Sequence, residues 1–220
     1  MFGQPFYVGH LGRTPVYVGG DILIMVALVW FWTQGGGILT FLTSLSMLLV
    51  AVVAHEGGHA AVARALGKQG VTIVIGAFGG VCIYAPERRR LSDMCIQFAG
   101  VTTNFVIAAI AWVLLGAGGR VELLIRDETF LGFIVFLFWW NLVLGIFNSL
   151  PIYPLDGGQA VLTGSSTLMG DGPRAKRLTL SVSVATAIAG VALAHHFGML
   201  SAFTLVMVLF LLYQAFNDLR

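Results

Sequence analysis

Long apolar stretches, separated by short polar intervals, run through most of the chain. Six of them approach the about 20 residues that a helix needs to cross the hydrocarbon core of a bilayer. They are Val16–Thr33, Ile38–Leu66, Cys95–Leu115, Phe130–Leu150, Leu178–Ala194 and Met199–Phe216. The first stretch is the weakest, because Asp21 lies near its start and the turn Gly35–Gly37 leaves little loop before the second. The pattern predicts an all-α polytopic membrane protein with about six transmembrane helices.

A shorter apolar region between the second and third stretches has a different pattern. Val71–Ile75 and Val81–Tyr84 are rich in β-branched and aromatic residues, and the segment Gly76–Gly80 between them is rich in glycine. This composition favours two short strands joined by a turn. A half-length hydrophobic helix is the alternative, which the glycines disfavour.

Composition excludes several classes of protein. Apolar residues make up 58% of the chain and charged residues only 10%, with a mean hydropathy of +0.91, unlike a soluble domain. The net charge of +2 supplies too few cations to bind a nucleic acid. Cys82 and Cys95 lack the spacing of a disulfide framework or a thiolate zinc site. No cationic segment precedes the first apolar stretch, so we expect no cleaved signal peptide.

The basic residues sort unevenly between the two sides that six alternating spans define. One side receives ten of the 12 cations, and Arg120 and Arg126 fall on the other. The ten are Arg13, Arg64, Lys68, Arg88, Arg89, Arg90, Arg174, Lys176, Arg177 and Arg220. Because cytoplasmic loops carry the excess of Lys and Arg, we expect a multi-pass protein of the cell membrane with both termini in the cytoplasm.

The second apolar stretch contains ionisable residues at a depth where charge is costly, which marks them as functional candidates. His55, Glu56 and His59 form a His-Glu-x-x-His pattern in a segment that should be helical. Residues four apart lie on one face of a helix, so both imidazoles could bind one metal while Glu56 reaches a water beside it. A polar contact between helices is the alternative.

A third metal ligand should then exist elsewhere in the chain. Asp156 is the remaining carboxylate that the pattern places within the apolar regions, in the segment NSLPIYPLDGG at 148–158. Pro151 and Pro154 must end or break the fourth span, so we expect Asp156 on irregular backbone, which is tolerated at depth only where protein or water satisfies it. The alternative is an aspartate that caps a cytoplasmic helix.

The two motifs resemble those of the site-2 protease family of intramembrane zinc metalloproteases. HEGGH at 55–59 and NSLPIYPLDGG at 148–158 carry the likeness, and AGVTTNF at 99–105 is similar to the family's third-span segment, with Val101 where a proline often stands. The resemblance covers residues 38–160, which we take as the catalytic core of a single membrane-embedded domain, 1–220. It implies one zinc ion per chain, held by His55, His59 and Asp156. No PDZ or CBS domain of the kind that some members carry is visible in the sequence, so we expect regulation by such modules to be absent or supplied by another protein.

The resemblance implies an enzyme that hydrolyses peptide bonds within or near transmembrane segments of membrane-protein substrates, as in regulated intramembrane proteolysis. Glu56 would be the general base, and Asn104 and Asn148 could orient the substrate or stabilise an oxyanion, unless they only join helices. The expected partners are a transmembrane protein substrate and the lipid bilayer, and no nucleic acid. The family also has a re-entrant hairpin in the region 71–84, whose strand edge could hold an unwound substrate. A transporter or an inactive relative is the alternative. Glu56 disfavours the inactive relative, and the lack of repeated halves disfavours the transporter.

Overall fold

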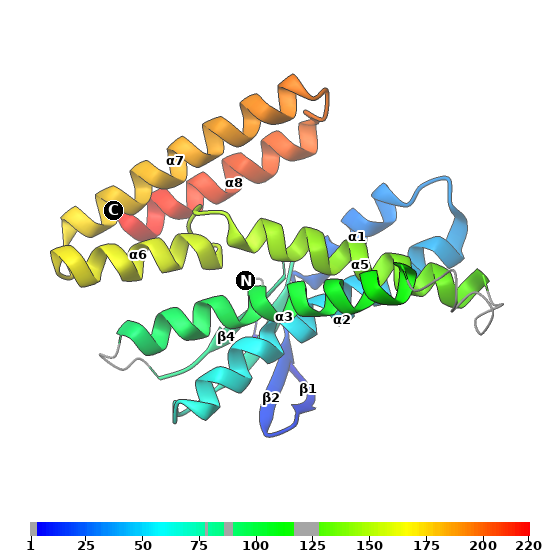
Figure 1. The fold of residues 1–220 in the computed structure, drawn as a ribbon, viewed down its shortest axis with the longest axis horizontal. Coiled ribbons are helices and arrows are strands. Elements are labelled where there is room, and N and C mark those ends of the chain that lie inside the picture. Colours follow the sequence, from blue (N-terminus) through cyan, green and yellow to red (C-terminus); the bar gives the residue numbers. More distant parts are fainter. Residues whose placement is uncertain (1–3, 78, 86–89, 117–127) are drawn as a thin grey trace. The chain divides into compact units, whose positions relative to one another are not determined.

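The computed structural model describes residues 4–77, 79–85, 90–116 and 128–220. The chain groups into two compact units, which are described separately below. The first unit comprises residues 1–87 and 99–145, and the second comprises residues 88–98 and 146–220. Figure 1 shows the order of the helices and strands along the chain.

The described residues are mostly helical, as predicted. The helices are α1 (Ile22–Trp32), α2 (Gly37–Ala65), α3 (Arg90–Gly116), α5 (Glu128–Ser149), α6 (Asp156–Met169), α7 (Pro173–His196) and α8 (Ala202–Leu219). Within the described part of the chain, five of these helices are long and apolar enough to cross a membrane, namely α2, α3, α5, α7 and α8. They coincide with five of the six predicted spans.

The predicted first span, Val16–Thr33, is wrong. Its beginning belongs to a strand, and the helix that follows, α1, has 11 residues. At 1.5 Å per residue α1 is about 16 Å long, roughly half the thickness of the hydrocarbon core. The β-branched and aromatic residues of Val16–Val18 favour the extended chain, and Gly19–Gly20 separates them from the helix.

A four-stranded sheet belongs to the first unit, where the sequence indicated only two strands. Its strands are β1 (Phe6–Leu11), β2 (Thr14–Val18), β3 (Thr72–Gly76) and β4 (Gly79–Ile83), and they lie in that order. The predicted hairpin is present as β3 and β4, which pair antiparallel from Thr72 opposite Ile83 to Gly76 opposite Gly79. The strands β2 and β3 are parallel, and α1 and α2 form the crossover connection between them.

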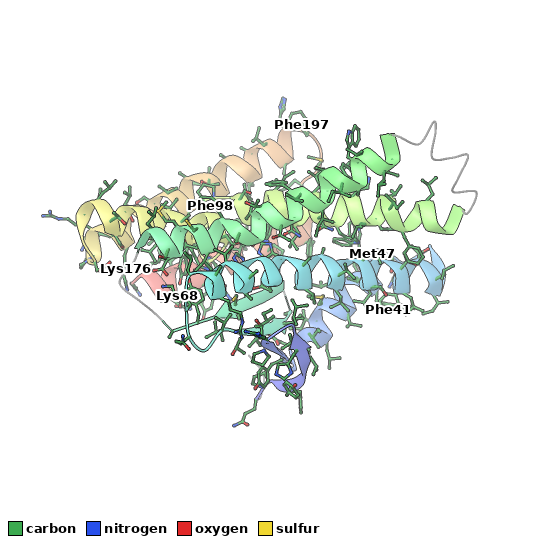
Figure 2. The ribbon with its side chains drawn as sticks, turned by 60° about the horizontal axis from the view of Figure 1, so that its bottom comes forward. Phe41, Met47, Lys68, Phe98, Lys176 and Phe197 are labelled. Carbon is green, nitrogen blue, oxygen red and sulfur yellow. The ribbon has the colours of Figure 1, made fainter. Side chains whose placement is uncertain are left out.

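The helix α2 has two halves with different surroundings. Before Ala51 its one buried residue is Ser44, whereas seven residues from Ala51 onward are buried. In Figure 2, Phe41 and Met47 mark the first half, and Lys68 lies beyond the far end of the helix. The large side chains that the first half exposes are apolar, including Leu39 and Leu42. Such a surface is stable in a bilayer and costly in water.

The second unit is built from α6, α7 and α8, and Figure 1 shows α7 and α8 side by side. Ile152, Ala187 and Leu211 form its buried cluster. Small polar residues join α6 to α7, where Ser165 Oγ lies 3.4 Å from Thr179 Oγ1. Hydroxyl groups and alanines at this contact let the two helices approach closely without large apolar side chains.

Candidate metal centre

The helix α2 positions the three ionisable residues of the first motif. His55 and His59 are one helical turn apart, and their Nε2 atoms lie 3.0 Å from each other. Both imidazoles and Glu56 are buried, with exposed fractions of 4%, 6% and 3% respectively. A regular helix is sufficient to bring the two ring nitrogens together, because side chains at i and i+4 project from the same face.

The helix α3 approaches these histidines through a glycine. A Cβ atom added at Gly100 would lie 2.8 Å from His55 Nε2 and closer still to His59 Nε2. A second glycine, Gly58 on α2, faces the α3 backbone, where an added Cβ would lie 2.9 Å from the carbonyl oxygen of Ala99. The two glycines therefore permit a close contact between α2 and α3 at the level of the imidazoles.

These residues fit a metal ion. The space beside both Nε2 atoms is the space that a side chain at position 100 would fill. Two nitrogens that share a tetrahedral zinc at about 2.0–2.1 Å are roughly 3.3 Å apart, close to the separation of the Nε2 atoms of His55 and His59. Neutral imidazole is a common ligand of zinc.

A chain of hydrogen bonds leads from the first histidine into two neighbouring helices. Asn104 Oδ1 on α3 lies 2.5 Å from His55 Nδ1. Asn104 Nδ2 donates to the Ala51 carbonyl oxygen over 3.2 Å and to Asn141 Oδ1 on α5 over 2.7 Å. Both asparagines are fully buried, so water does not compete for these hydrogen bonds.

The strand β4 lies beside Glu56. A Cβ atom added at Gly80 would lie 2.8 Å from both Cδ and Oε1 of the carboxyl group. Burial raises the pKa of the nearby Cys82 thiol to about 12, and the charge of Glu56 adds to this shift. The glycine therefore leaves the space that the Glu56 side chain occupies next to the strand.

The second motif belongs to the second unit and begins where α5 ends at Ser149. Asp156 is the first residue of α6, so the prediction that it lies on irregular backbone is wrong by one residue. The irregular segment is 150–155, and it contains a cis peptide bond between Tyr153 and Pro154. Asp156 is buried and lies in the first turn of α6.

Two glycines shape this turn. A Cβ atom added at Gly157 would lie 2.5 Å from the Leu150 carbonyl oxygen, and one added at Gly158 would lie 2.6 Å from the Ile152 carbonyl oxygen. The turn is also tied to α7, because the Tyr153 backbone N–H donates to Ser183 Oγ over 3.0 Å. Backbone packed this closely has no room for a larger residue at either position.

The predicted site residues therefore divide between the units. His55, Glu56, His59 and Asn104 lie in the first unit, and Asn148 and Asp156 lie in the second. Sequence reasoning gave no role to Asn141, placed Gly80 in the turn of the hairpin rather than in a strand, and used Gly100 only as part of the third-span segment. An amide within the apolar run of α5 was the one signal for Asn141. The two glycines gave no signal by themselves, because a close approach depends on which segments pack together.

The chain matches the sequence models of two peptidase families. Residues 22–152, more than half of the chain, match the family described as Peptidase M50B-like. Residues 123–190 match Peptidase family M50. The first range contains the histidine pair and the second contains Asp156.

The chain is also similar to named proteins. It is 33% identical over 175 residues to the putative zinc metalloprotease Rip3 of Mycobacterium tuberculosis, which is 73% of this chain and 41% of that protein. It is 31% identical over 170 residues to a putative zinc metalloprotease of Synechocystis, again 73% of this chain and 41% of the relative. The chain therefore spans less than half the length of these relatives.

A solved structure shares the fold. The Site-2 Protease from Methanocaldococcus jannaschii has a TM-score of 0.70 to this chain, with 99% of this chain and 96% of that chain covered at 20% identity. The fold and the family matches confirm the resemblance that the motifs indicated. The chain belongs to peptidase family M50, the family of the site-2 proteases.

Proposed function

We propose that this protein is an intramembrane zinc metalloprotease that hydrolyses peptide bonds within or near transmembrane segments of membrane proteins. The observation that carries the proposal is the buried His55–His59 pair with Glu56 beside it, on a helix long and apolar enough to cross a membrane. A metal-binding pair and a carboxylate in an apolar segment need a function to offset their cost. Membership of a peptidase family supports the same conclusion.

Zinc is held in this proposal by His55, His59 and Asp156, one ion per chain. Two neutral imidazoles and one carboxylate are a donor set found in catalytic zinc sites, where a fourth position stays open. Asp156 is the carboxylate of the second motif, and it lies in the part of the chain that matches Peptidase family M50. A bound zinc would lower the pKa of water toward neutrality and polarise a peptide carbonyl.

Glu56 is the general base in this mechanism. Its carboxylate follows His55 directly and is held at β4, so it can take a proton from water as the oxygen attacks the peptide carbonyl carbon. The same carboxyl group then delivers the proton to the departing amine nitrogen. Asn148 is the uncharged candidate to orient the substrate or stabilise the oxyanion. Asn104, the other candidate from the sequence, donates both of its N–H groups to Ala51 and Asn141.

The outer edge of β4 is the proposed contact for the substrate backbone. Among the described strands β4 pairs only with β3, so one of its two edges stays open. A transmembrane helix hides its peptide groups in internal hydrogen bonds, and an unwound segment could pair with that edge instead. Strand β3 cannot serve in this way, because β2 and β4 occupy both of its edges.

Proline substitutions test the role of that edge. Single prolines at Val81, Cys82 and Ile83 should lower cleavage most where the lost N–H faces the substrate, with zinc content unchanged. Prolines at Ile73 or Val74 in β3 are the contrast, because both residues are buried and these variants should lose stability as well. A β4 series that cleaves like the unaltered protein would assign the hairpin to anchoring.

The active site is proposed to open toward the cytoplasm of a protein in the cell membrane. Arg64, near the end of α2, donates to Thr14 Oγ1 over 2.8 Å and to the carbonyl oxygen of Arg13, so these cations share one side. Four further crossings, by α3, α5, α7 and α8, would return Arg220 to that side. Arg88, Arg89, Arg120 and Arg126, which the charge count also used, lie outside the described residues.

Cysteine labelling tests this orientation. Lys176 lies near one end of α7 and Phe197 lies just beyond the other end (Figure 2). In a protein whose native cysteines are replaced, Lys176→Cys should react with an impermeant reagent only from the cytoplasm, and Phe197→Cys only from outside. The reverse pattern would invert the orientation.

Two expectations from the sequence stay predictions. One is a single domain over 1–220 with its core at 38–160, and the other is a separate regulatory protein.

Substitution of the general base tests the activity itself. Glu56→Gln should lower cleavage of a purified single-span reporter protein by about 10²–10⁴-fold while zinc content is unchanged, because the amide cannot accept the proton. Asp171→Asn, the same change at an exposed turn residue, is the matched control and should cleave normally. Equal cleavage by the Glu56→Gln variant would refute the assignment, and no cleavage by the unaltered protein would favour an inactive relative.

A further inference from the structure

The hydrogen-bond chain at His55 has a fixed direction. The Ala51 carbonyl oxygen, 3.2 Å from the Asn104 side chain, can only accept a hydrogen bond. The amide group that faces it must therefore be Nδ2, and the oxygen of Asn104 must face His55 Nδ1. Because this oxygen can only accept, the imidazole carries its proton on Nδ1 and leaves a lone pair on Nε2.

The outer end of the chain is fixed by the same logic. Asn141 Nδ2 donates to the Leu137 carbonyl oxygen over 2.8 Å, so Asn141 Oδ1 is the atom turned toward Asn104. Backbone carbonyl groups on α2 and α5 thus orient both amides. With both asparagines fully buried, turning either amide would leave buried polar groups unsatisfied.

We infer that Asn104 and Asn141 are positioning residues of the zinc site, which hold His55 in the tautomer whose Nε2 can bind the metal. The inference rests on the proposed function only in naming the metal. Partners that fix the tautomer and ring orientation of a ligating histidine raise metal affinity, and their loss costs 10–100-fold. Here that partner is an uncharged amide carried by α3, which itself is held by an amide from α5.

This arrangement also separates Asn104 from a substrate. The two N–H groups of its amide are used by the Ala51 carbonyl oxygen and by Asn141 Oδ1. Neither is left to donate to an oxyanion, so Asn104 acts through His55. If Asn104 only joined helices, any hydrogen bond between them would be sufficient. The position of the proton on the His55 imidazole would then not matter.

The first test measures the tautomer in the unaltered, zinc-free protein. Nitrogen-15 NMR of histidine-labelled protein at a pH of about 8, where imidazole is mostly neutral, should show His55 protonated on Nδ1. The His55→Gln variant assigns the signal. A neutral His55 protonated mainly on Nε2 would overturn the inference. Since neither zinc nor a substrate is needed, this result does not depend on whether the protein cleaves peptides.

The second test compares amide substitutions on the same helix. Asn104→Leu should weaken zinc binding by 10–100-fold in a chelator competition. Asn104→Asp should weaken it less, because it keeps an oxygen facing Nδ1–H, but it loses both N–H donors to Ala51 and Asn141 and should lower the melting temperature. Asn141→Leu should lose less than Asn104→Leu, because it acts one hydrogen bond further away. The cobalt-substituted Asn104→Leu protein should also show an altered visible spectrum.

The control for a merely structural role is Gln97→Leu. Gln97 is a buried amide on α3 that donates to Thr163 Oγ1 over 2.9 Å, within the second unit. Gln97→Leu removes this buried hydrogen bond and should lower the melting temperature while zinc affinity stays unchanged. Equal zinc affinities in the Asn104→Leu and Gln97→Leu proteins would overturn the inference. Zinc binding without peptide cleavage in the unaltered protein would contradict the proposed function alone.

Discussion

The two segments that carry the predicted zinc ligands are built in different ways. Residues 55–59 are part of a continuous helix of 29 residues, and helical periodicity alone aligns the two imidazoles. Residues 148–158 contain the end of one helix, a turn with a cis proline, and the start of another helix. Their geometry depends on where single backbone atoms lie.

The difference shows where each segment is vulnerable. In the first segment, glycines on the partner elements α3 and β4 make room for side-chain tips, at Gly100 and Gly80. In the second, Gly157 and Gly158 make room for backbone carbonyl groups. A side-chain tip can move aside at small cost, but backbone cannot. A substitution at a glycine beside the first segment should therefore weaken metal binding with little loss of stability. A substitution at a glycine of the second segment should reduce both.

The largest expected effect comes from removing a ligand from each segment. His59→Ala and Asp156→Ala should each lower zinc affinity by at least about 100-fold, more than a supporting residue would. Zinc content after dialysis, measured by atomic emission, checks this, with Asp171→Ala as the control. If Asp156→Ala kept one zinc per chain, the metal would belong to the helical segment alone.

The second effect concerns the turn. Gly157→Ala should destabilise the protein by about 1–3 kcal/mol, because the new methyl group meets the carbonyl oxygens of Ser149 and Leu150. Gly164→Ala, later in the same helix, has nothing within 4 Å of the added Cβ and should be neutral or stabilising by up to about 1 kcal/mol. Thermal unfolding in detergent measures both. Equal melting temperatures would mean that the turn is not held by backbone packing.

A smaller effect on stability, but a specific one on metal, is expected at the helical segment. Gly100→Ala should weaken zinc binding roughly 10-fold or more, comparable to losing a supporting residue, because the methyl group displaces the two Nε2 atoms. Gly116→Ala, at the end of the same helix in open space, is the control and should bind zinc normally. Loss of stability without loss of zinc affinity in Gly100→Ala would reverse the contrast between the segments.

The smallest effect is on the alkylation rate of Cys82, which lies near Glu56. With its pKa raised to about 12, Cys82 is almost entirely the neutral thiol at pH 8. Its alkylation should be roughly 50-fold slower than that of an ordinary cysteine, the smaller thiolate fraction being partly offset by a more nucleophilic thiolate. The rate should rise about tenfold per pH unit up to the pKa. Mass spectrometry of peptides from a Cys95→Ser protein measures it, and the denatured protein is the control.

Much of the fold followed from simple patterns in the sequence. Five long apolar runs became helices, and the β-branched residues around Gly76–Gly80 became a hairpin, because burial in lipid and local propensity act over neighbouring residues. Strands β1 and β2 did not follow. The residues Val16–Val18 are as apolar as a span, and they form a strand that pairs with β1 on one side and with β3, far along the chain, on the other.

The candidate site was predictable to a different degree in each segment. His55, Glu56 and His59 were predicted because they are ionisable residues in an apolar segment, and the two histidines are one helical turn apart. The role of Asn104 could not be derived from sequence, because its partners Ala51 and Asn141 are 53 and 37 residues away. The directions in which the Asn104 amide points its two N–H groups and its oxygen are decided only when α2, α3 and α5 have packed together.

The parallel pairing of β2 with β3 also sets an order of events during biosynthesis. Val18 pairs with Ile75, so the N-terminal hairpin cannot join the sheet until the ribosome has made α1, α2 and β3. Closing so long a loop is slow compared with forming a helix. The first long helix, α2, is therefore fully synthesised before the four-stranded sheet can form, and β4 joins the sheet only after the histidines of α2 have been made.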